Sequence, residues 1–108
     1  MSSVSDERMR EVIQKMLNNF NAEKALGIVT RIQLNFTDGK YWVSIENQQV
    51  NIGEGAIENP DVTLSADMQD YIDMINGDLN PIMAFMSNKL RVEGNPSIAL
   101  KMQQIFGF

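Results

Sequence analysis

The chain has 108 residues, a formal net charge of −5 at pH 7, and neither histidine nor cysteine. Its length and its 44% apolar residues fit one folded domain, residues 1–108, with a single core. The acidic charge argues against nucleic acid as a partner and disfavours tight docking on anionic lipid, while the missing His and Cys remove the usual general base, thiolate nucleophile and zinc ligands.

The chain begins with a predicted amphipathic helix. Ser5 is a suitable N-cap, and acidic residues follow it in the first turn, where they favour the positive end of the helix dipole. Apolar residues then recur with helical spacing, at Met9, Val12, Ile13, Met16, Leu17 and Phe20. We expect a short turn of helix over residues 21–27.

From Ile28 the apolar period changes to two, which predicts strands. Asp38-Gly39 marks a hairpin, and Tyr41, Val43 and Ile45 alternate with polar residues and Trp42 on the return strand. Three further alternating segments centre on the pairs Val50/Ile52, Val62/Leu64 and Leu90/Val92. Five strands with one apolar face each predict a sheet that is covered on one side.

Three helices are predicted in the second half of the chain. Asp67 caps residues 68–76, and Gly77 ends that helix. Asn-Pro pairs open the helices at 81–87 and 96–106, because Asn is a good N-cap and Pro fits the first helical position. The fold class is therefore α+β, with two layers: a five-stranded, mostly antiparallel sheet and helices packed on one face.

The helix at 81–87 has more apolar surface than one buried face needs, since residues 82–86 are all apolar. Leu100 lies off the apolar stripe of its own helix. Two interpretations stay open: the helix is buried on all sides between sheet and helices, or its side chains line an apolar cavity between the layers. The eight methionines favour the second, because thioethers adapt to varied apolar partners.

The order of elements from Asn59 to Phe106 resembles the sterol carrier protein type 2 family. The motifs that carry the resemblance are Asp61-Val62-Thr63, Asn80-Pro81, Ala84-Phe85, Lys89-Leu90, Gly94-Asn95 and Ala99-Leu100-Lys101-Met102-Gln103. The resemblance implies a five-stranded sheet with helices on one face. It also implies a tunnel for sterols, fatty acids, fatty acyl-CoA and related lipids. The N-terminal half matches in element order alone.

The resemblance implies ligand contacts at Trp42, Phe85, Met102 and Gln103. When apolar residues of the three helices in the second half of the chain are added to these four, the expected ligand-binding residues are Trp42, Ile72, Ile75, Ile82, Phe85, Met86, Met102, Gln103 and Phe106. Family members often carry a polar residue after Asn-Pro, and Ile82 in that place favours a plainer apolar ligand. By strict alternation Trp42 points away from the apolar face, as a half-covered side chain or a dimer contact, unless a bulge at residues 47–49 reverses the register.

We therefore expect non-enzymatic binding and transport of apolar lipids, such as fatty acid, fatty acyl-CoA, sterol-like or isoprenoid molecules, with no catalytic residue, metal or cofactor. The alternative is an accessory module that holds a partner protein in a lipid or quinone biosynthetic assembly. A homodimer and transient membrane contact also stay open, as does closure of the cavity by Phe106-Gly107-Phe108. The regular spacing of Asp67, Asp70 and Asp73 favours a solvated helix face over a metal site.

A cytoplasmic location is expected, because no apolar run is long enough to span a bilayer and residues 1–8 lack a secretory signal. The final tripeptide gives no support for a peroxisomal address.

Overall fold

The structure is a computed structural model that describes residues 4–37 and 39–106, with side chains from residue 7 onward. The elements in chain order are α1 (Val4–Asn19), β1 (Thr30–Phe36), β2 (Gly39–Glu46), β3 (Gln49–Glu54), β4 (Val62–Ala66), α2 (Met68–Asn76), α3 (Pro81–Met86), β5 (Leu90–Gly94) and α4 (Pro96–Phe106). The predicted strands and the four other helices are all present, whereas the short turn of helix predicted over residues 21–27 is a run of turns at residues 22–27. α1 begins at Val4, one residue before the predicted cap Ser5. The side chain of Ser5, as well as Asp38, Gly107 and Phe108, lies outside the described residues.

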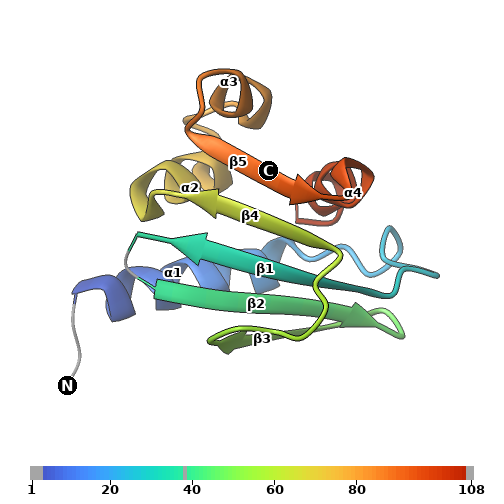
Figure 1. Cartoon of the computed structure of the whole chain (residues 1–108). Helices are drawn as coiled ribbons and strands as arrows, with labels where there is room; N and C mark the ends of the chain where they lie inside the picture. Colours follow the sequence, from blue (N-terminus) through green and yellow to red (C-terminus); the bar gives the residue numbers. More distant parts are fainter. Residues whose placement is uncertain (1–3, 38, 107–108) are drawn as a thin grey trace.

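The five strands form one sheet in the order β3-β2-β1-β4-β5 (Figure 1). β1 and β4 are parallel, while the other three neighbouring pairs are antiparallel. This arrangement confirms the predicted five-stranded, mostly antiparallel sheet of an α+β fold. The sheet is open, with β3 and β5 as its edge strands.

α1, α2 and α4 lie on one face of the sheet, which we call the inner face, whereas α3 lies beyond the edge strand β5 (Figure 1). Every second residue of each strand points to this face, where its side chain packs against α1, α2 and α4 to form the core. Ile32, Leu34, Val43 and Ile45 are fully buried there. The stripe on α1 is buried at Met9, Val12 and Met16, whereas Leu17, which was also assigned to it, is exposed. No helix in the described part of the chain is long and apolar enough to cross a membrane.

The segment between β3 and β4 crosses the opposite, outer face of the sheet over β2 and β1 (Figure 1). Gln33 on β1 holds it: Nε2 donates to the carbonyls of Tyr41 (2.9 Å) and Gly55 (3.0 Å), and Oε1 accepts from the Ile57 N–H (2.9 Å). Gln33 is 6% exposed, and these bonds satisfy both ends of its amide.

Residues 47–49 form no bulge, the condition under which the register of Trp42 would reverse. Asn47 and Gln48 both have positive φ, 53° and 60°, which is the geometry of a two-residue hairpin turn, and β3 begins directly afterwards at Gln49. The register of β2 is therefore regular. It pairs Trp42 with Gln33 on one side and with Gly53 on the other, so the indole lies on the outer face.

The Asn-Pro pairs cap their helices as predicted. Asn80 Oδ1 accepts from the N–H groups of Ile82 (2.8 Å) and Met83 (3.3 Å), and Asn95 Oδ1 accepts from Ser97 N–H (2.9 Å). Asp67 occupies the cap position of α2 without a side-chain cap bond. α3 ends at Met86, one residue earlier than predicted.

Candidate functional site

An apolar groove lies between α3 and α4, above the inner face of β4 and β5. Its volume is about 400 Å³, which falls in the range of small-molecule sites. We call it the α3–α4 groove. It is lined by Leu64, Pro81, Ile82, Phe85, Leu90, Val92, Gly94, Pro96, Ala99, Leu100 and Gln103.

The strand register builds the floor of this groove. β4 and β5 pair Leu64 with Val92 and Ala66 with Leu90, so these side chains share the inner face. At the β5 edge no further strand or core helix covers them, and α3 and α4 form the walls instead.

Three local features place α3 beside β5. Asn80 caps the helix and Pro81 fixes its first turn. Ala84 is fully buried, and its small side chain allows a close approach of α3 to the domain. The Lys89 N–H donates to the Ala84 carbonyl (2.8 Å), which ties the end of α3 to the start of β5.

The far end of β5 is joined to β1 and β4 through Asp61. Its Oδ2 accepts from Thr30 Oγ1 (2.8 Å) and Arg31 N–H (3.0 Å), and its carbonyl accepts from Asn95 N–H (3.0 Å). These hydrogen bonds, with Arg31 first and Thr30 second, hold the pKa of Asp61 below its ordinary value. Gly94 has φ 99°, and a Cβ there would lie 2.5 Å from the Asp61 carbonyl oxygen, so glycine is required.

The chemistry of the α3–α4 groove is that of a hydrocarbon site. Among its lining residues none is charged, and Gln103 is the one with a polar side-chain group. Such a surface gains free energy by removing apolar ligand surface from water, and one amide can orient a polar end. The described side chains hold no group of three or more acidic residues placed to bind a metal ion.

The structure brings three of the nine predicted contact residues together in this groove: Ile82, Phe85 and Gln103. Ile72 and Ile75 line a separate depression of about 460 Å³ between α1 and α2. Their contact with a ligand stays a prediction.

The remaining four predicted residues do not line the groove. Met86 is 75% exposed, whereas Met102 and Phe106 are buried in the core, where the Phe106 ring centroid lies 5.7 Å from that of Phe20. Trp42 is on the outer face of the sheet. Ligand contact at these positions also stays a prediction.

Sequence reasoning missed most of the groove floor. Leu64, Leu90 and Val92 look like ordinary core residues of strands, and nothing in their pattern shows that β5 is an edge strand. Leu100 did carry a signal, because it lies off its helix stripe and is exposed at the groove.

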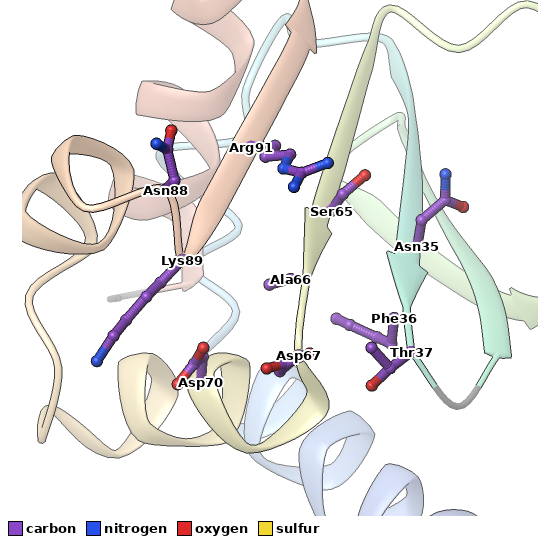
Figure 2. Close-up of a pocket in the computed structure, with 10 residues that line it drawn as sticks. All are labelled: Asn35, Phe36, Thr37, Ser65, Ala66, Asp67, Asp70, Asn88, Lys89 and Arg91. Carbon is purple, nitrogen blue, oxygen red and sulfur yellow. The ribbon is translucent and has the colours of Figure 1, made fainter.

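A third hollow, of about 440 Å³, lies where β4 ends and β5 begins. Figure 2 shows side chains from β1, β4, β5 and the start of α2 around it, with Asp67 and Asp70 as well as Lys89 and Arg91. Because charges of both signs line this cavity, it offers no single charge to a ligand, and its polar lining does not suit a lipid chain.

Comparison with known proteins identifies the family. The sequence model of the SCP-2 sterol transfer family matches residues 9–107. Hydroxysteroid dehydrogenase-like protein 2 of Xenopus laevis is 31% identical over 98 residues, which are 90% of this chain and 24% of that protein. The chain thus spans a minor part of the length of the curated relatives that it matches.

Two solved structures share the fold. Palmitated SCP2L2 from Aedes aegypti has a TM-score of 0.71 and 20% identity, over 99% of this chain and 96% of that one. The ubiquinone synthesis protein UbiJ-SCP2 has a TM-score of 0.69 and 13% identity, over 92% of this chain and 93% of that one. With the family match over nearly its whole length, this chain belongs to the SCP-2 sterol transfer family.

Proposed function

We propose that this chain is a non-enzymatic lipid carrier and that the apolar part of its ligand lies in the α3–α4 groove. The observation that carries the proposal is an uncharged apolar groove at the open edge of the sheet, in a chain of a sterol transfer family. In this proposal residues 1–108 form one lipid-binding domain. We also propose that the domain is located in the cytoplasm.

The energetics of apolar burial suit a carrier. Burying a chain of about a dozen methylenes is worth roughly 10 kcal/mol at ~0.8 kcal/mol each. The loss of translational and rotational freedom and the ordering of side chains remove several kcal/mol of this gain. The remainder corresponds to a dissociation constant between about 1 nM and 1 μM, which permits both binding and release.

A ligand with a single acyl chain fits the groove best. The neighbour from Aedes aegypti is described as palmitated, which supports this class. Ile82, an apolar residue directly after Asn80-Pro81, adds hydrocarbon contact at one wall. Gln103 on α4, which lines the groove, supplies an amide for a neutral or carboxyl head group.

The proposal is tested by native mass spectrometry of the purified chain, before and after incubation with palmitic acid and with cholesterol. Phe85→Glu and Leu100→Glu each place a charge at an exposed position of the groove, so both variants should fold. We expect palmitic acid to bind them at least about tenfold more weakly, because burying the carboxylate beside a lipid chain is costly.

The matched control is Leu26→Glu, which makes the same change at a residue that is 69% exposed and does not line the groove. Equal affinity in all three variants would place the ligand elsewhere. A charge at Met102, which is 1% exposed, would report on unfolding instead and is therefore not used.

A second candidate function is an accessory module that binds a partner protein. The named role of the neighbour UbiJ-SCP2 in ubiquinone synthesis supports it, as do relatives in which the matched region is a minor part of a longer protein. A stable complex with a biosynthetic enzyme, formed while the chain carries no lipid mass, would favour this function over the carrier.

A further inference from the structure

The hollow in Figure 2 lies apart from the α3–α4 groove and shares no lining residue with it. Its volume is about 440 Å³, and its four charged side chains come from two short segments. Asp67 and Asp70 belong to the start of α2, while Lys89 and Arg91 belong to the start of β5. Figure 2 shows Asp67 and Asp70 on one side of the space and Arg91 on the other. We call this space the polar hollow.

The strand register aligns the polar side chains of one wall. Asn35 on β1 pairs with Ser65 on β4, and Ser65 pairs with Arg91 on β5, so these three residues form one row across the outer face of the sheet. β4 ends at Ala66 and α2 begins at Met68, which brings the first turn of α2 to the same end of the sheet. The polar hollow is therefore built mainly on strands and a helix.

The four charges of the polar hollow have no partners of their own in the described part of the chain. There, no ion pair or side-chain hydrogen bond joins them to each other or to another residue. Asp67 occupies the cap position of α2 but makes no side-chain cap bond, whereas Asp73, one turn beyond Asp70, accepts a hydrogen bond from Gln69 (2.9 Å). Two acids that face two cations across an open space suit a ligand that carries both charges.

The two sides of the polar hollow suit different chemical groups. A primary ammonium is a donor of hydrogen bonds and no acceptor, so it matches the pair of carboxylates. A phosphate offers several acceptor oxygens, which match the guanidinium of Arg91, the hydroxyl of Ser65 and the ammonium of Lys89. A quaternary ammonium has no N–H donor and favours an aromatic cage, whereas Phe36 is the one aromatic residue in this lining.

We propose that the polar hollow binds a phosphoethanolamine group, with the primary ammonium between Asp67 and Asp70. The phosphate binds Arg91, Lys89 and Ser65 on the opposite side. This group supplies a partner of opposite sign to each pair of charges in the polar hollow. It occurs both as a free small molecule and as the head of a phospholipid. The site goes beyond the proposed carrier function, because it lies outside the α3–α4 groove.

The test is a titration of the isotope-labelled chain with O-phosphoethanolamine, followed through the backbone amide signals in NMR spectra. We expect saturable shifts at the residues of the polar hollow, with a dissociation constant on the order of 1 mM, because the ligand is small and the charges are partly solvated. Added salt should weaken this binding. Ethanolamine alone and inorganic phosphate alone should each bind roughly tenfold or more weakly, since each meets one side of the site.

The proposal is overturned if no saturable shifts appear, or if either fragment binds as tightly as O-phosphoethanolamine. Equal binding of phosphocholine would also overturn it, because the carboxylate pair would then make no use of ammonium N–H donors.

Charge-removing variants test the two sides separately. Asp70→Asn and Arg91→Gln should each weaken the binding of O-phosphoethanolamine roughly tenfold or more, because each removes a charge from one side. The matched controls Asp73→Asn on α2 and Arg10→Gln on α1 make the same changes outside the polar hollow and should bind like the wild type. All four positions are at least partly exposed, so the variants should fold. Equal losses in variants and controls would overturn the proposal.

Two further titrations identify the source of the group and separate the two proposals. Binding of monomeric lysophosphatidylethanolamine that depends on Asp70 and Arg91 supports the site with a lipid head as its ligand, whereas binding of O-phosphoethanolamine alone supports it with the free molecule. Palmitic acid should bind Asp70→Asn and Arg91→Gln like the wild type, because neither residue lines the α3–α4 groove. A wild type that binds O-phosphoethanolamine but neither palmitic acid nor cholesterol would overturn the carrier function alone.

Discussion

The indole of Trp42 lies over Gly53, its partner on the neighbouring strand β3, in the space that a side chain at Gly53 would need. An ideal Cβ at Gly53 would lie 2.5 Å from Cε2 and 2.8 Å from Nε1 of the indole. Both residues belong to the outer face of the sheet, away from the helices. Gly53 thus gives Trp42 a place to pack on this face.

Gly53→Ala should lower the free energy of unfolding by about 1–3 kcal/mol, because the added methyl group overlaps the indole and one of them must move. Chemical denaturation measures the loss. In a Trp42→Ala background the same substitution should cost less than about 1 kcal/mol, since the contact is gone. If Gly53→Ala lowered the free energy of unfolding equally in both backgrounds, overlap with the indole would not be the cause of the loss.

Trp42 is also a probe of where the ligand binds. The α3–α4 groove lies on the inner face and Trp42 on the outer face, so palmitic acid in the groove should leave the position of Trp42 emission unchanged. A fluorescence titration alongside mass spectrometry measures this directly. A blue shift that saturates with the added mass would support the predicted ligand contact at Trp42 and move the site to the outer face.

The side chain of Asn80, which caps α3, should contribute more to the free energy of unfolding than Asp67, which occupies the cap position of α2. Asn80→Ala removes two cap hydrogen bonds and should cost about 1 kcal/mol of unfolding free energy. It should also weaken palmitic acid binding, because α3 forms one groove wall. Asp67→Ala is the control, since Asp67 makes no side-chain cap bond and its loss should cost little. Equal costs would contradict the cap assignment.

Asp61 should contribute to stability in a pH-dependent way. Its pKa is lowered from 3.8 in the folded chain, so its contribution is present above about pH 4 and is lost as the pH falls through the lower folded value. Asp61→Asn should therefore destabilise the chain at neutral pH, by less than about 1 kcal/mol because the carboxylate is exposed.

Unfolding curves from pH 7 down to pH 2 measure this contribution. The wild type and Asp61→Asn should converge at the acidic end, where the carboxylate of the folded wild type becomes protonated. A constant difference across the range would show that the charge of Asp61 plays no part.

The sequence predicted element order well because its signals are local. The apolar period changes from helical to strand spacing at Ile28, and Asn80-Pro81 and Asn95-Pro96 mark the starts of α3 and α4. The turn at Asn47-Gln48 was missed because neither residue is a glycine, and only the paired strands show that both adopt positive φ.

By itself the sequence determined the α+β fold, the family, and an apolar excess at residues 82–86, because each depends on residue order or type along the chain. The tertiary structure decided how that excess is used. β5 became an edge strand, so Phe85 and Leu100 border an open groove, while Met102 and Phe106, only a few residues further along α4, are buried in the core. Strand order and helix placement arise from long-range packing, which local periodicity does not encode.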